Sequence, residues 1–310
     1  MMDLATLTMN PALDAACEVE RVAPTIKLRA NHERYDPGGG GINVARVFVR
    51  LGGNARCYYL SGGATGVALD GLLDLHQLVR KPIRIAGQTR ISTAVHEGST
   101  GQEYRFVPAG PQISEGEWRE CLNQLEQANH DYLVASGSLP RGVPEDFYAR
   151  VAAIARRNGM RFVLDTSGPA LAAGLAGGDV FLAKPSLEEF RVLVGEDVAG
   201  EEAITQAAMA VVERGEAEFL AVTMGSSGAV LASRSGPLLL PAMPVEPRSA
   251  VGAGDSFLAA MVHALALGKQ PEDAFRFGIA AGAAAVLTSG TDLCRAEDVQ
   301  QLYARQIEPG

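Results

Sequence analysis

Ser249-Ala250-Val251-Gly252-Ala253-Gly254-Asp255-Ser256 runs directly into an apolar segment, 257–267. The two glycines permit positive φ and close approach of a ligand, and the apolar segment predicts a helix. The N–H groups of Ala253, Gly254 and Asp255 can then point outward, with the positive end of the helix dipole behind them. The pattern predicts an anion-binding loop beside a carboxylate base, although an isolated Gly-x-Gly-Asp is more often a capped helix start.

Composition limits the class of protein. A chain of 310 residues with 47% hydrophobic content can bury a full core. The net charge of -9 argues against a general nucleic-acid or anionic-membrane surface, so local clusters of cationic side chains become informative. The four cysteines form no Cys-x-x-Cys pair, and residues 1–4 lack the basic segment of a signal peptide. We therefore expect a reduced, cytoplasmic protein.

Short apolar runs alternate with helical segments along most of the chain. Strands are expected at 4–8, 55–60, 132–136, 161–164, 180–182 and 219–223. This alternation predicts an α/β fold, with a mainly parallel sheet flanked by helices on both faces. Four other segments, 17–22, 28–35, 89–97 and 102–107, instead alternate apolar and polar residues. We expect a core formed by residues 1–16, 36–86 and 110–310, and a small inserted β-sheet lid formed by residues 17–35 and 87–109.

Several loops suit ligands, and each also has an ordinary structural explanation. The glycine run 38–41 aims the amide of Asn43 at an approaching ligand, or is a mobile turn with an Asn cap. Asp14 can accept hydroxyl protons from a sugar, or cap a turn. The turn 223–228 suits nucleotide phosphates or an ordinary hairpin, and the small residues of segment 275–285 suit a purine ring or close helix packing.

Together these segments resemble the ribokinase-like, PfkB-type family of carbohydrate kinases over almost the whole chain. Gly38-Gly39 with Asn43 resembles the first family signature, and segment 251–256 resembles the second. Asp165 to Gly168 and Lys184-Pro185 also follow the order and spacing of the family. Other segments are most similar to the branch of the family that phosphorylates fructose 6-phosphate: Thr6-Leu7-Thr8 with Pro11 and Asp14, Lys27-Leu28-Arg29, Pro37 to Arg46, Gly62 to Gly66, Tyr104 to Val107, Ser136 to Pro140 and Gly290-Thr291.

The resemblance implies transfer of the γ-phosphoryl group of ATP to a sugar hydroxyl. Asp255 would be the base, and the N–H groups of Gly252, Ala253 and Gly254 would stabilise the phosphoryl group in transfer. Sugar contacts are implied for Asp14, Gly39, Asn43 and Ser138. Nucleotide contacts are implied for Lys184, Ser186, Thr223, Gly225, Gly228, Gly278, Gly282 and Ala285. Mg²⁺ would bind mainly through phosphate oxygens and water, with Glu189 in its outer shell, and the backbone at Ser249, Val251, Thr288 and Gly290 matches a family site for potassium.

A cluster of cationic residues narrows the range of possible substrates. If Glu97 pairs with Gln102, Ala94 lies opposite Arg105, so Arg90 and Arg105 share one face of the lid. Lys27 and Arg29 lie on or beside the other lid segment. Such a cluster in an acidic protein indicates a phosphate dianion, and fructose 6-phosphate is the expected acceptor.

Alternatives remain open at this stage. Fructose 1-phosphate or tagatose 6-phosphate can take the place of the acceptor, and a non-catalytic sugar-phosphate sensor can share the fold. The sequence also departs from the family pattern, since Ser186 stands where the family has Asn before Glu189. Exposed lid edges need cover, which predicts a homodimer through the lid.

Overall fold

The main sheet contains nine strands in a computed structural model that describes residues 3–195, 198–288 and 292–307. The strand order is β13-β12-β11-β10-β9-β8-β1-β4-β5, and all pairs from β11 to β5 are parallel. The strands are β1 Asp3–Thr8, β4 Asn54–Ser61, β5 Val79–Arg84, β8 Tyr132–Ser136, β9 Arg161–Asp165, β10 Val180–Ala183, β11 Ala217–Thr223, β12 Ala229–Ser233 and β13 Gly236–Leu240. The predicted mainly parallel sheet is therefore confirmed.

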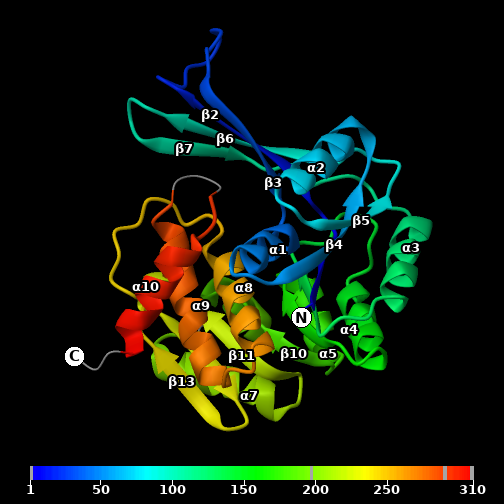
Figure 1. Ribbon diagram of the computed structural model, residues 1–310, viewed down its shortest axis with the longest axis vertical. Coiled ribbons are helices and arrows are strands. Elements are labelled where there is room, and N and C mark those ends of the chain that lie inside the picture. The colour runs from blue at the N-terminus through cyan, green and yellow to red at the C-terminus, as the bar shows by residue number, and fades with distance from the viewer. Residues whose placement is uncertain (1–2, 196–197, 289–291, 308–310) are drawn as a thin grey trace.

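Helices cover both faces of this sheet (Figure 1). Along β8, Tyr132 and Val134 belong to the apolar cluster under one group of helices, while Leu133 and Ala135 belong to the cluster under the other. The first group is α1 Gly40–Arg50, α2 Gly63–Leu75, α8 Ala253–Ala266, α9 Pro271–Val286 and α10 Ala296–Ile307; the second is α3 Glu115–Glu126, α4 Phe147–Arg157, α5 Gly168–Ala176, α6 Leu187–Val194 and α7 Glu201–Glu213. None of the helices in the described ranges is long and apolar enough to cross a membrane.

A second sheet of four strands projects beyond the helices as the lid (Figure 1). Its order is β3-β2-β6-β7, with bounds β2 Ala12–Val19, β3 Asn31–Gly38, β6 Arg90–Glu97 and β7 Gln102–Phe106. The predicted pairing of Glu97 with Gln102 and of Ala94 with Arg105 is confirmed. The first two strands were expected at 17–22 and 28–35, but strand pairing already begins at Ala12 and continues to Gly38. Both strands therefore start and end closer to the main sheet, where they carry Asp14 and Asp36.

Candidate active site

The site lies where the direction of the sheet connections reverses. The chain enters at β1, continues outward to β4 and β5, and later returns to β8 on the opposite side of β1. Ligands bind such sheets outside the carboxyl ends of the strands at this reversal. The lid leaves from the end of β1, and segments 136–138, 165–168 and 184–186 leave from the ends of β8, β9 and β10.

Asp255 lies in the first turn of α8, behind a glycine with a left-handed backbone. Gly252 is the N-cap residue with φ of 74°, and a Cβ there would also meet Leu293 Cδ2. Three N–H groups were expected to be free, but Ala253 N–H donates to Ala250 O across 3.4 Å. Of the three N–H groups that the resemblance assigns to the anion loop, those of Gly252 and Gly254 therefore remain.

The carboxylate of Asp255 accepts a hydrogen bond from Asn43. The Asn43 Nδ2 to Asp255 Oδ2 distance is 2.9 Å, which joins the first turns of α1 and α8. Burial and the negative charge of Asp165 raise the pKa of Asp255 to about 6, against the lowering effects of Asn43 and Lys184. A carboxylate with this pKa is charged at neutral pH and is a stronger base than an ordinary aspartate.

A buried ion pair lies beside this base. Lys184 Nζ is 3.0 Å from Asp165 Oδ1, and Ser136 Oγ donates to Asp165 Oδ2 across 2.9 Å. A Cβ on Gly254 would lie 3.3 Å from Lys184 Nζ, so the ammonium group lies against the first turn of α8. Burial acts to lower the pKa of Lys184, but Asp165 and other carboxylates outweigh it and raise the pKa. The ammonium group is therefore charged where a phosphate would meet the helix.

Glycine is required where the lid meets α1. A Cβ on Gly38 would collide with the carboxylate of Asp14, and Gly39 has φ of 115°. These glycines let strand β3 pass directly over Asp14 and deliver Asn43 to the start of α1. The expected group of Asp14, Gly39 and Asn43 is thus brought together at the junction between lid and core.

Asp14 faces two lid arginines. In the register, Ala12 pairs with Arg90, Asp14 pairs with Ser92, and Ala94 pairs with Arg105. Paired residues share a face, so Asp14, Arg90 and Arg105 all lie on one side of the lid. Burial raises the pKa of Asp14 to about 6, while the positive charges of Arg105 and Arg90 act to lower it. Arg90 is held by the carbonyl oxygens of Pro108 and Asn10, each at 2.8 Å.

Lys27 and Arg29 lie apart from this group. Both are exposed in the loop joining β2 and β3, at the end of the lid away from the main sheet (Figure 1). In the part of the chain that is described, neither side chain forms a hydrogen bond or ion pair, and neither contributes to the pKa of Asp14. The structure therefore gathers two of the four expected cationic groups around Asp14.

The expected nucleotide side is formed by the ends of β10 and β11. Ser186 caps α6 and bridges to Thr223, and its N–H donates to Glu189 Oε2 across 2.8 Å. Ser186 thus caps α6 with a hydroxyl group where the family pattern has an amide side chain. After Thr223, the chain turns through Gly225 and Gly228, and a Cβ on Gly228 would collide with Leu240 O.

Helix α9 carries the three small residues that were expected to line the adenine site. Gly278 and Ala285 are buried, and a Cβ on Gly278 would lie 3.1 Å from Phe257 O on α8. Close helix packing therefore explains the small residues at these two positions. Gly282 is partly exposed and stays available to a ligand.

The loop at 249–251 packs against the end of α9. Ser249 N–H donates to Val286 O across 3.3 Å, and Val251 N–H donates to Ser249 Oγ across 3.2 Å. Thr288 Oγ1 donates to Asp292 O across 2.8 Å. Of the four residues expected at the potassium site, Gly290 lies outside the described residues.

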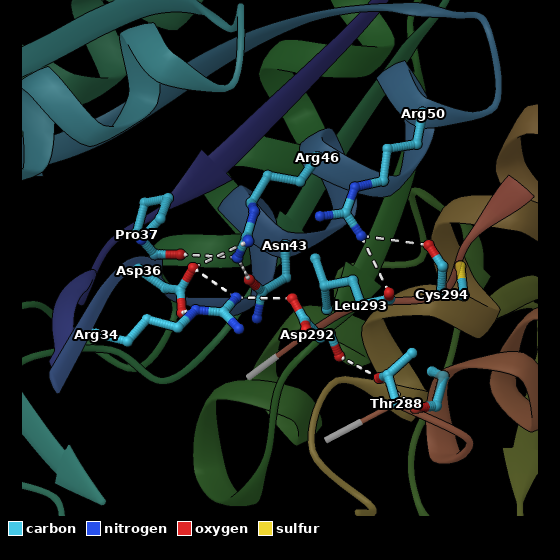
Figure 2. A network of polar contacts seen from close by, with 11 residues as sticks. Arg34, Asp36, Pro37, Asn43, Arg46, Arg50, Thr288, Asp292, Leu293 and Cys294 are labelled. Atoms are coloured by element: carbon cyan, nitrogen blue, oxygen red, sulfur yellow. Dashed lines mark hydrogen bonds and ion pairs between the residues drawn. The ribbon is translucent and has the colours of Figure 1, made fainter. Parts of the chain in front are cut away.

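Four charged residues at the lid junction escaped the sequence analysis (Figure 2). Arg34 Nε lies 2.7 Å from Asp36 Oδ2, and Arg34 Nη2 lies 2.7 Å from Asp292 Oδ1. Arg46 is buried, three residues after Asn43, and contacts both Asp36 and Asn43. Asn10 was missed too; its Nδ2 donates to the expected sugar ligand Ser138 at Oγ across 3.2 Å. The signal for Arg46 was its i+3 spacing from Asn43 on an amphipathic helix.

Comparisons with known proteins agree with this arrangement. The model of the pfkB family carbohydrate kinases matches residues 7–298. The ATP-dependent 6-phosphofructokinase isozyme 2 of Mycobacterium tuberculosis is 43% identical over 308 residues, covering 99% of this chain and 90% of that protein. The enzyme of the same name from Escherichia coli is 38% identical, covering 98% and 99%. A crystal structure of phosphofructokinase-2 from Escherichia coli in complex with potassium has a TM-score of 0.94 at 38% identity, covering 98% of this chain and 99% of that chain.

Proposed function

The chain belongs to the pfkB family of carbohydrate kinases, and we propose that it uses ATP to phosphorylate fructose 6-phosphate to fructose 1,6-bisphosphate. The observation that carries this proposal is the position of Asp255, between the sugar-facing residues of the lid junction and the positive end of α8. Its pKa responds to Asp14 on one side and to Lys184 on the other. One carboxylate can therefore contact a sugar hydroxyl beside the terminal phosphate of ATP.

In the proposed reaction, Asp255 accepts the proton of the sugar hydroxyl. The hydroxyl oxygen then bonds to the γ-phosphorus, the bond to the ADP oxygen breaks, and ADP leaves. The N–H groups of Gly252 and Gly254, with the ammonium of Lys184, stabilise negative charge on the transferring group. Asn43 and Asp14 hold sugar hydroxyls, Ser138 lies on the loop that follows β8, and Arg90 with Arg105 contacts the phosphate of the sugar.

The proposal includes two metal ions, Mg²⁺ and potassium. Glu189 uses Oε2 on the Ser186 N–H, so its other oxygen can accept a water of a phosphate-bound Mg²⁺. Mg²⁺ neutralises the phosphate oxygens when bound. Backbone carbonyls at Ser249, Val251 and Thr288 suit potassium, because this loop is already held against the end of α9. Higher activity in potassium than in sodium at equal ionic strength would support this assignment.

We also propose that the chain forms a homodimer through the lid. Tyr35, Ile91 and Phe106 lie on the lid face opposite Asp14 and are 48%, 40% and 61% exposed. β3 and β7 are open edges of the four-stranded sheet. Burial of these groups against a second lid removes both features. Sedimentation should give a dimer that Phe106→Lys weakens, and a monomeric wild-type protein under assay conditions would contradict the proposal.

A substrate panel tests the catalytic proposal. ADP release with ATP would be measured for fructose 6-phosphate, fructose 1-phosphate, tagatose 6-phosphate and unphosphorylated fructose. The highest kcat/KM is expected for fructose 6-phosphate, with fructose far below it because it lacks the group that the arginines bind. A higher value for another sugar phosphate would change the acceptor, and no ADP release with any of them would indicate a sensor.

A further inference from the structure

Arg46 is a buried cation that the proposed reaction does not use. It lies on α1 beneath the base of the lid and is only 2% exposed. Its Nη1 donates to Asn43 Oδ1 and to Pro37 O, both across 3.3 Å, and its Nη2 lies 3.5 Å from Asp36 Oδ1 (Figure 2). Burying a charge costs free energy unless the charge is well paired, so a buried arginine at this position needs a functional or structural reason.

The contact with Asn43 fixes which way its amide faces. A guanidinium group can only donate, so it holds the amide oxygen and leaves the amide NH₂ for Asp255, 2.9 Å away. In the reversed amide, the oxygen would face the carboxylate of Asp255 and the NH₂ would face Arg46. Both contacts would then be repulsive, so Arg46 selects the orientation that supports the charged base.

Asp36 connects this arrangement to the lid. Asp36 lies on β3 and also binds Arg34 at 2.7 Å, so it is shared by an arginine of the lid and an arginine of the core. Burial lowers the pKa of Arg46 to about 10, which leaves it charged at neutral pH. The planar guanidinium has five donors in a fixed fork, so it can contact an amide, a carbonyl and a carboxylate at once in a defined geometry.

We propose that Arg46 is a positioning residue for the base: held by Asp36, it orients the Asn43 amide so that Asn43 donates to Asp255. This inference rests on the proposed role of Asp255. It predicts that removing Arg46 impairs catalysis only while Asn43 is present to be misoriented. Asp36, Arg46 and Asn43 thus form a relay, a series of three contacting side chains that leads from the base of the lid to the carboxylate of Asp255.

A mutant cycle on kcat tests the relay. Arg46→Met should lower kcat about 10- to 100-fold, comparable to the loss of one charge-assisted hydrogen bond at the base. It should also shift the acidic limb of the kcat profile to higher pH, because a hydrogen bond to the charged form keeps the pKa of Asp255 down. In an Asn43→Ala background, Arg46→Met should lower kcat less than about twofold further, since the two residues act as a unit. Equal losses in both backgrounds would overturn the proposal.

Two further variants keep the test decisive. Arg80→Met is the matched control, because Asp70 is a buried aspartate also shared by two arginines, Arg80 and Arg84. It should leave kcat and its pH profile unchanged. If Arg46→Met does not fold, Arg46→Lys retains the charge without the fork and should still move the acidic limb upward. An unmoved limb in a folded Arg46→Lys protein would overturn the proposal.

Asp255→Asn separates this inference from the proposed function. If Asp255→Asn abolishes phosphoryl transfer while the Arg46 cycle is additive, the base assignment stands and the relay falls. If Asp255→Asn retains wild-type kcat, Asp255 is not the base, and the proposed role of Arg46 is contradicted with it.

Discussion

The carboxyl edge of the main sheet and the lid hold their charges in different ways. At the edge, Lys184 is paired with Asp165 at 3.0 Å, and Asp255 is held by Asn43 at 2.9 Å. On the lid, the side chain of Arg105 is 46% exposed, and its ion pair with Glu103, at 3.8 Å, is long. The proposed reacting groups are thus preorganised by the core, whereas the proposed phosphate-binding group is on a more exposed sheet. Changes in the first region should act on kcat, and changes in the second should act on KM.

The largest expected effect is that of Asp255→Asn. An amide cannot accept the hydroxyl proton, so kcat should fall by about 10³-fold, within the range for loss of a general base. KM for fructose 6-phosphate should change little. A coupled assay of ADP release measures both constants, with Asp146→Asn on the surface as the control. A kcat within tenfold of wild type would remove Asp255 from its role.

The next effect is on the lid. Arg105→Met should raise KM for fructose 6-phosphate about 10- to 100-fold, because a charge-assisted hydrogen bond to phosphate contributes about 1.5–3 kcal/mol. The slow reaction with unphosphorylated fructose should be unaffected, which separates phosphate recognition from a general loss of folding. Arg119→Met, an exposed arginine on α3, is the matched control. An equal loss with both sugars would contradict a phosphate contact.

The third effect is on stability, and its sign follows from the raised pKa of Asp255. A carboxyl with a pKa of about 6 in the folded state and 3.8 unfolded destabilises the fold once it is charged. This cost is absent below pH 3.8, grows as the pH rises to 6 and is complete above it. Asp255→Asn should therefore raise Tm at pH 7.5 by several degrees, because a difference of about two pKa units corresponds to about 3 kcal/mol. The difference should vanish near pH 4, and a lower Tm for the variant at pH 7.5 would contradict the burial of the charge.

The smallest effect is expected where the two regions touch. Arg34 reaches Asp292 across 2.7 Å, with side chains 42% and 36% exposed. Such a pair contributes at most about 1 kcal/mol and is screened by salt. Asp292→Asn should change KM for fructose 6-phosphate less than about threefold, and the difference should disappear in about 1 M sodium chloride. A large change in kcat would contradict a purely structural role of the Arg34–Asp292 ion pair between the lid and the core.

The same division explains what the sequence could predict. The strands Tyr132–Ser136 and Arg161–Asp165 were predicted almost to the residue, because the buried centre of each is a continuous apolar run. β5 was missed because it is an edge strand with four charged or proline residues, Arg80-Lys81-Pro82 and Arg84. Asp255 and Asn43 were singled out as candidate site residues because a glycine-rich loop precedes each of them.

The buried charges could not be predicted in this way. Arg46, Asp36 and Asp292 are far apart in sequence or surrounded by ordinary helical residues, and only the fold brings them together. At Gly278 and Ala285 the sequence leaves two explanations, since a small residue fits a ligand and a neighbouring helix equally well. The residue type alone does not distinguish a ligand contact from close helix packing.

Calorimetric titration of fructose 6-phosphate into two variants tests most directly whether chemistry and recognition are held by separate regions. The account predicts that Asp255→Asn binds the sugar phosphate within about threefold of wild type, while Arg105→Met binds it at least about tenfold more weakly. Weak binding by Asp255→Asn together with normal binding by Arg105→Met would contradict it.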